Sequence, residues 1–430
     1  MCAIGSQKAN MGSLMSEIDP TKLDIFTPTH SSLYNACVGN NSLHNLHTYA
    51  EGYLQAAKIL LSQIFEKQLL YERDTLVHPI LYSARHAIEL SIKHVLTKLN
   101  ECDIKTDEKQ LHGHSLKELW HLFEIQTQFD RRLKIIVENV KPIVKQFDEA
   151  DPDAQDFRYP KNVEGVQTLE GKFIVDLITV GKLVYYLDEK ILKLFELIRI
   201  IVDERNLNAF TKEMNRDELR QLSIELPSYK TWAKSEDFEK VKQLWRKNLG
   251  LSNNAFSRAV NFIKNHREFA GNIGIEHDFI SLNEELLREV MATAYDVKKE
   301  RIADREIEGF ARMIKPDPSY KYLAALTDKL SADAIAELSA IFYISRDHRY
   351  SEEFDFVYNY HQRDFKGLTG ERLEKAKKQS FFHVFSKSNF INEVVGGLGK
   401  IGKLSLAKEL EKYIINEELE LQSLGVSMEF

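Results

Sequence analysis

The sequence predicts an all-α fold, with a helical bundle over residues 42–205, a second helical domain over residues 206–430 and at most a small β element. Glycine and proline are scarce, at 19 and 9 of 430 residues, whereas a β-rich fold needs many turns that use them. Apolar residues recur every three or four positions over long segments, which is the spacing of one helix face. Several of these segments begin at residues that cap helices, so the helical pattern has defined starts.

Five long helices are predicted in the first domain. The clearest start is Ser115, because Ser115 and Glu118 form a Ser-x-x-Glu capping box just before an apolar run. Pro79 suits a first helical turn, where its missing N–H has no partner to lose, so the second helix is expected to begin there. The five predicted helices are 42–70, 79–99, one that begins at 115, 129–147 and 176–204.

Less regular segments divide the rest of the chain. Residues 1–41 are expected to form an N-terminal arm, and the acidic stretch 148–171 leads into a short hairpin that pairs 166–169 with 172–175. The polar stretch 206–235, broken by a proline, is expected to hold the domain boundary. The helices predicted in the second domain are 236–248, 253–268, 282–298, 302–314, 331–345, 350–361, 370–384 and 404–418.

A glycine-rich segment near the end has the spelling of a nucleotide-binding loop. Gly397 to Gly402 reads Gly-x-Gly-x-x-Gly, and Lys403 follows it. Leu404 stands where a phosphate loop needs Ser or Thr, and the residues that remain are too few for the βαβ unit that these motifs require. We therefore expect a flexible basic turn between helices.

Overall charge and cysteine content narrow the class of protein. The net charge is −7, so RNA is expected to bind only at a local site and not through a generally basic surface. Three widely spaced cysteines form neither a disulfide framework nor a cysteine-based zinc site, which fits a cytoplasmic location. No apolar run reaches the length of a membrane span, so no membrane association is expected, and the first residues lack the apolar core of a secretory signal.

Histidines are concentrated in the first domain. Nine of the fourteen lie between His30 and His121, where an even spread would place about three. Histidine transfers protons near neutral pH. Any catalytic chemistry is therefore expected in the first domain.

One group of polar residues within a single predicted helix is a candidate for a site. Arg85 and Glu89 lie one helical turn apart on the same face, and His86 is next to that face. Glu89 would then orient Arg85 toward a phosphate. The alternative is a plain surface ion pair.

The loops around the predicted helix at Ser115 supply further candidates. His112 and His114 precede this helix, whose N-terminal N–H groups attract anions such as phosphate. Arg158 lies in a Tyr-Pro loop and either reaches a ligand or pairs with a neighbouring aspartate, such as Asp151. For His114 the alternative is a solvated residue with no role.

Several segments resemble the HEPN superfamily of helical-bundle proteins. Arg73 to His78 reads Arg-x4-His, the form of the superfamily's ribonuclease motif. Further strings, taken in order, are similar to a group of bacterial HEPN-like proteins over about residues 42–205. These strings are Tyr49-Ala50-Glu51-Gly52-Tyr53, Ala84-Arg85-His86-Ala87-Ile88-Glu89-Leu90, His112-Gly113-His114-Ser115-Leu116 and Phe157-Arg158-Tyr159-Pro160.

The resemblance implies a metal-independent endoribonuclease, of the kind found among toxins and phage-defence effectors, that forms a homodimer across its active groove. A histidine would act as base or acid, and an arginine would stabilise charge on the phosphate. We rank Arg85 and His114 above Arg73 and His78, because Arg-x4–6-His matches also arise by chance.

No metal and no other cofactor is expected, and the second domain would bind a protein partner or restrain the nuclease. The alternative is a non-catalytic helical binding or scaffold protein, which would use the same bundle to dimerise or to hold a protein or nucleotide partner.

Overall fold

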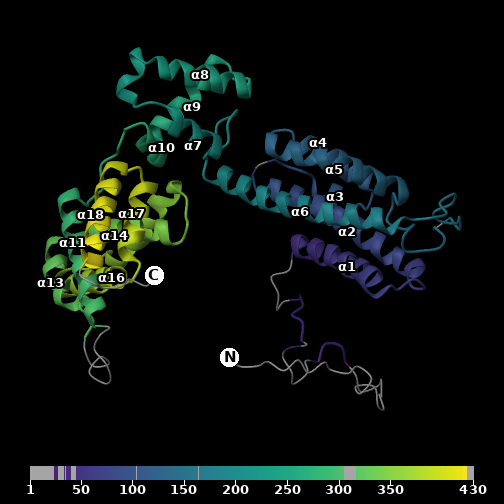
Figure 1. Ribbon diagram of the computed structural model, residues 1–430, viewed down its shortest axis with the longest axis horizontal. Helices are drawn as coiled ribbons and strands as arrows, with labels where there is room; N and C mark the ends of the chain where they lie inside the picture. The colour runs from purple at the N-terminus through teal and green to yellow at the C-terminus, as the bar shows by residue number, and fades with distance from the viewer. Residues whose placement is uncertain are drawn as a thin grey trace. The chain divides into compact units, whose positions relative to one another are not determined.

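The structure is a computed structural model that describes residues 24–27, 33, 35–39, 45–102, 104–162, 164–304 and 316–423. The chain forms two compact units, residues 1–199 and 200–430. The described residues form helices and the loops between them, and their only β pairing is an isolated antiparallel bridge between Lys161 and Gln167 (Figure 1). The all-α prediction is therefore confirmed.

The first unit is built from helices that pack along one another. α1 packs along α2, α2 against α4, and α4 against α5. Lys58 of α1 contacts Asp188 of α6 at 2.5 Å, and the rings of His94 of α2 and Phe195 of α6 meet edge to face, so α6 joins the same bundle (Figure 1). The helices of this unit are α1 (Leu46–Lys67), α2 (Arg73–Asn100), α3 (Glu108–Leu111), α4 (Leu116–Gln126), α5 (Arg131–Ala150) and α6 (Leu177–Asn206), the last of which continues past residue 199, where this unit ends.

Side-chain caps explain where three of these helices begin. Ser115 Oγ accepts the N–H of Glu118 at 3.4 Å, which confirms the predicted start of α4. Asn45 and Thr48 form a reciprocal capping box on α1, and Asp130 caps α5. Each cap gives a partner to N–H groups that the first helical turn leaves without one.

The second helix starts earlier than predicted. α2 begins at Arg73, so Pro79 lies inside the helix and not at its first turn. Proline removes the hydrogen bond that the N–H of residue 79 would donate to the carbonyl of Thr75, and its ring crowds that carbonyl. Ile80, Leu81 and Ala84, which follow it, are buried, and burial of this continuous face outweighs the lost bond.

The hairpin predicted across residues 166–175 does not form. The bridge between Lys161 and Gln167 is the extent of pairing among the described residues of this segment. Phe173 and Ile174 are 92% and 91% exposed. A strand pair needs a surface on which to bury one face, and these side chains have none.

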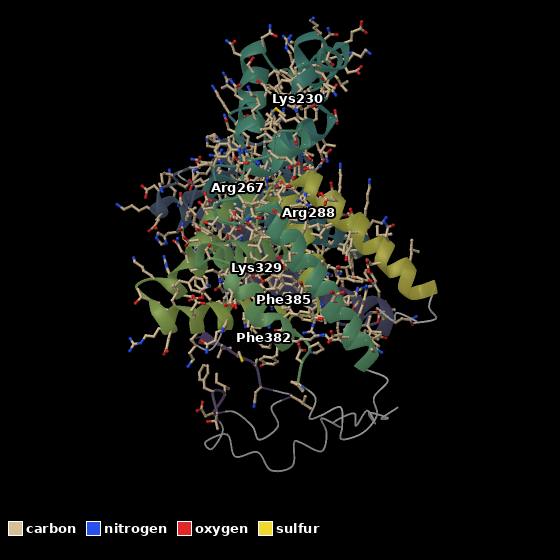
Figure 2. The ribbon with its side chains drawn as sticks, turned by 90° about the vertical axis from the view of Figure 1, so that its left-hand side faces the viewer. Lys230, Arg267, Arg288, Lys329, Phe382 and Phe385 are labelled. Atoms are coloured by element: carbon tan, nitrogen blue, oxygen red, sulfur yellow. The ribbon has the colours of Figure 1, made fainter. Side chains whose placement is uncertain are left out.

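The second unit contains two apolar cores. One is formed by helices between residues 214 and 273, and the other by helices between residues 282 and 410, where Phe385 is fully buried (Figure 2). The helices of this unit are α7 (Arg216–Glu225), η5 (Tyr229–Lys234), α8 (Glu236–Leu249), α9 (Asn253–Asn265), α10 (Arg267–Asn272), α11 (Glu284–Asp304), α13 (Ser319–Lys329), α14 (Ala332–Arg346), η6 (Ser351–Glu353), α15 (Phe354–Gln362), η7 (Arg363–Phe365), α16 (Gly370–Phe385), α17 (Phe390–Lys400) and α18 (Leu404–Ser423).

Three of the longer helices in this unit were not predicted. The stretch 206–235, expected to hold a boundary, contains α7, which buries Leu219 and Leu222 in the first of the two cores. α13 and α17 were also missed, and the helix predicted over 302–314 falls mostly outside the described residues. None of the described helices is long and apolar enough to cross a lipid bilayer.

The glycine-rich segment is a packed helix and not a flexible turn. Gly397 lies in α17, which packs against α14. A Cβ atom on Gly397 would stand 1.9 Å from the carbonyl oxygen of Ile341. Glycine is therefore needed here because the two helix backbones approach too closely for any side chain. Only Gly402, with φ +78°, serves as a turn residue at the end of α17.

A buried ion cluster joins helices from the two cores of the second unit. Arg216 of α7 contacts Glu268 at 2.6 Å and Glu352 at 2.8 Å, and His266 Nε2 lies 2.9 Å from Glu352. Burial raises the pKa of Glu352, but the contacts from His266 and Arg216 outweigh it and lower the pKa to about 2. The carboxylate is therefore ionised throughout the neutral range.

Candidate functional site

The carboxylate of Glu89, in the middle of α2, is the centre of a polar cluster in the first unit. Its side chain is 1% exposed. Oε2 accepts a hydrogen bond from Arg85 Nη1 at 2.8 Å, and Oε1 accepts one from Lys93 Nζ at 2.9 Å. Nδ1 of His114 lies 2.9 Å from Oε1. Nδ1 of His86 lies 3.9 Å from Oε2, a distance for a charge contact and not for a hydrogen bond.

The charge on Glu89 determines which ring nitrogen of His114 donates to it and which one is left over. Burial raises the pKa of Glu89, but the contacts from His86, Lys93 and His114 outweigh it, so this pKa lies well below its ordinary value of 4.5. An ionised carboxylate only accepts, so Nδ1 of His114 donates to it. The His114 side chain is 64% exposed, so its Nε2 atom remains available to a ligand.

Arg85 lies beneath the cluster and does not reach its surface. The side chain is fully buried, and besides its bond to Glu89 it donates to main-chain carbonyls. Nε donates to Asp151 at 2.8 Å, and Nη2 donates to His114 at 2.7 Å and Pro152 at 3.1 Å. The expected contact of Arg85 with a phosphate is therefore wrong in this structure. Arg85 is a positioning residue that ties α2 to the loops before α4 and after α5.

The loop after α5 is held rigidly by Asp151, which is also fully buried. Its Oδ1 accepts the N–H groups of Gln155 at 2.6 Å and Asp156 at 2.9 Å, while Oδ2 lies 3.4 Å from Arg85 Nε. Asp151 thus pairs with Arg85 and not with Arg158, the alternative raised by the sequence. The Nε atom of Arg158 donates to a carbonyl within its own loop, that of residue 154.

Beside Glu89, five side chains form what we call the aromatic edge: Tyr53 of α1, Tyr82 and His86 of α2, and Arg158 and Tyr159 of the loop. The His86 ring meets Tyr53 edge to face at 4.6 Å and stacks on Tyr82 at 5.5 Å. The Arg158 guanidinium lies 5.5 Å from the Tyr82 ring and 5.3 Å from the Tyr159 ring. Burial and the neighbouring Tyr53 raise the pKa of Tyr82, so its hydroxyl stays protonated at neutral pH.

Three other predicted residues lie away from this cluster. Arg73 and His78 are exposed in the first turns of α2. Five residues apart on a helix, they point about 140° apart, and His78 lies about 16 Å along the axis from Glu89. His112 is exposed at the end of α3 and is not among the side chains that bond to Glu89.

Sequence reasoning assigned no role to several members of the cluster. Lys93, four residues after Glu89, could have been found from helical spacing alone. Tyr53 and Tyr82 lie on different helices, and the role of Asp151 depends on a loop brought to α2 by tertiary packing. No local pattern contains that information.

In the described parts of the chain, no group of three histidine, cysteine, aspartate or glutamate side chains is arranged to hold a metal ion. Comparison of the chain with family models, with characterised proteins and with solved structures gives no match. The function of this site is therefore inferred from the geometry of the cluster.

Proposed function

We propose that the first unit is a metal-independent endoribonuclease of the HEPN type, with its active site at the Glu89 cluster. One observation carries the proposal: two imidazoles, those of His86 and His114, have their Nδ1 atoms 3.9 Å and 2.9 Å from oxygens of one buried, ionised carboxylate. A carboxylate in this position fixes the orientation of the ring, as in other histidine-carboxylate pairs.

Two adjacent histidines supply the base and the acid that RNA cleavage needs. One neutral imidazole takes the proton of a ribose 2′-OH as its oxygen attacks the adjacent phosphorus. The other, protonated, gives a proton to the 5′-oxygen as its bond to phosphorus breaks. The products are a 2′,3′-cyclic phosphate and a free 5′-hydroxyl, and no metal takes part.

Positive charge for the phosphate comes from the surface of the cluster. Arg158 is exposed, and its guanidinium lies beside the Tyr82 and Tyr159 rings of the aromatic edge, so it is placed for the role first assigned to Arg85. Lys93, next to Glu89, adds a second positive charge. Together they make a local basic site on an acidic chain.

The test is cleavage of a labelled single-stranded RNA by the full chain in the presence of EDTA. His114→Ala and His86→Ala should each lower kcat by roughly 10²–10⁴ as acid–base catalysis is lost. His121→Ala, which removes an exposed histidine of α4, is the matched control and should cleave like wild type. Wild type that leaves RNA intact, or His114→Ala that cleaves it at the wild-type rate, would overturn the proposal.

A second candidate function, self-association without catalysis, is favoured by an apolar stripe on α6. Ile178, Tyr185 and Leu192 recur every seven residues and are 61%, 54% and 46% exposed. Residues seven positions apart lie on nearly the same face of a helix, and a second copy of α6 would cover this apolar stripe.

Sedimentation of the full chain tests this second candidate. Wild type should sediment as a dimer at micromolar concentration, and Tyr185→Glu should sediment as a monomer. Lys145→Glu, on an exposed residue of α5, should remain dimeric. A monomeric wild type would exclude self-association through this stripe.

A further inference from the structure

The aromatic edge has properties that acid–base chemistry does not require. Tyr159 has a large aromatic side chain and is nevertheless 53% exposed. Arg158 beside it is also exposed. Tyr159 connects to the candidate catalytic His86 through three successive contacts, of which the first two join Tyr159 to Arg158 at 5.3 Å and Arg158 to Tyr82 at 5.5 Å. Tyr82 then stacks on His86 at 5.5 Å. A row of flat groups thus leads from the surface to the imidazole.

Exposed planar groups of this kind are suited to binding nucleobases. Nucleobases stack on tyrosine rings and on guanidinium planes, and any base can do so because each has a π face. The cation adds attraction for the phosphates on either side of a stacked base. Bases in a duplex are already stacked on one another, so an open strand is the form of RNA that fits.

The edge is also built before any ligand arrives. Arg85 and Asp151 hold the loop that carries Arg158 and Tyr159, through the bonds described above. The hydroxyl of Thr168 donates to the carbonyl of Tyr159 at 2.7 Å, and Pro160 confines the Tyr159 backbone to extended conformations. A ligand therefore orders few groups when it binds, which favours affinity.

We propose that the aromatic edge is a nucleobase-binding subsite for single-stranded RNA, in which a base next to the reacting phosphate stacks on Tyr159. The subsite rests on the proposed function, because it places the strand so that its phosphate reaches His86 and His114. It assigns to Tyr159 and Arg158 the selection of unpaired over paired RNA.

The test measures affinity with 2′-O-methyl RNA, which lacks the attacking hydroxyl and therefore stays intact with the wild-type chain. A fluorescein-labelled octanucleotide is compared with versions in which one abasic ribose is moved along the strand, and binding is followed by fluorescence polarisation. In wild type, one abasic position should weaken binding by roughly 5- to 100-fold. Tyr159→Ala should weaken binding of the intact strand by a similar factor and should no longer respond to the abasic position.

Two variants serve as controls. Tyr159→Phe keeps the ring and should bind like wild type, and Tyr360→Ala, which removes a 58% exposed tyrosine of the second unit, should do the same. A Tyr159→Ala variant that binds like wild type or keeps its abasic response overturns the subsite. Equal affinity of wild type for the corresponding RNA duplex also overturns it.

The failure of the subsite and that of the nuclease are distinguishable. If Tyr159→Ala cleaves ordinary RNA with unchanged KM, the subsite is wrong while the nuclease stands. If the strand binds through Tyr159 but ordinary RNA is never cleaved, the subsite stands and the nuclease is wrong. When both are right, Tyr159→Ala raises KM by the same 5- to 100-fold and leaves kcat near wild type.

Discussion

Replacement of Arg85 by methionine should destabilise the first unit far more than an ordinary arginine substitution. Methionine fills much of the volume, but it leaves the carboxylates of Glu89 and Asp151 without the cation between them. It also removes donors from three carbonyls, which now accept at 2.7, 2.8 and 3.1 Å. Removal of one partner from a buried ion pair lowers the free energy of unfolding by about 3–5 kcal/mol, and we expect a loss in this range.

Urea unfolding followed by circular dichroism measures the loss, and hydrogen exchange of α2 and of residues 151–160 assigns it to the first unit. Arg73→Met is the matched control. Arg73 lies on the same helix, is 53% exposed and has only a 3.5 Å contact with Asp74, so its loss should stay below about 0.5 kcal/mol. A loss below about 1 kcal/mol for Arg85→Met would refute the role of Arg85 as the buried tie between α2 and the two loops.

Three further predictions concern packing and pH. Gly397→Ala should destabilise the second unit by at least about 2 kcal/mol in urea unfolding, because its methyl group meets the Ile341 carbonyl, whereas Gly399→Ala, with open space around it, should stabilise it by about 0.5–1 kcal/mol. The pKa of Glu352 is lowered from 4.5 to about 2, so this carboxylate contributes about 3 kcal/mol to the free energy of unfolding above pH 4.5, and the contribution is lost as pH falls toward 2. Glu352→Gln should not show this loss of stability. Parallel curves of stability against pH for the two proteins would contradict the prediction. Burial lowers the pKa of His94 to about 4, so the unfolded chain binds a proton that the folded one does not, and stability should fall as pH drops from 6.5 to 4; His94→Phe should remove that part of the slope.

The sequence located the centre of the candidate site because its first members share one helix. Arg85, His86 and Glu89 follow helical spacing, and Ser115 marks the helix start that brings His114 nearby. Burial of Arg85 could not be read from spacing, because it depends on the loop that Asp151 folds against α2. Helical pairs of this kind are usually exposed.

Tertiary packing also explains why two predictions about the fold were wrong. Local preference predicts a helix start at Pro79, but the buried face of α2 continues the helix through this residue. Glycine often marks a turn, but Gly397 is needed because the backbone of α14 lies too close for a side chain. In both cases tertiary packing outweighed a local preference.

The chemistry of the cleaved ends tests the central claim most directly. Full-length protein is incubated with single-stranded RNA in EDTA, beside the same sequence as 2′-O-methyl RNA, and the products are analysed by mass spectrometry. If the Glu89 cluster performs acid–base cleavage, the RNA fragments end in 2′,3′-cyclic phosphate and 5′-hydroxyl, and the 2′-O-methyl strand stays intact. RNA that remains uncut, or a 2′-O-methyl strand that is cut as fast as RNA, would contradict the account.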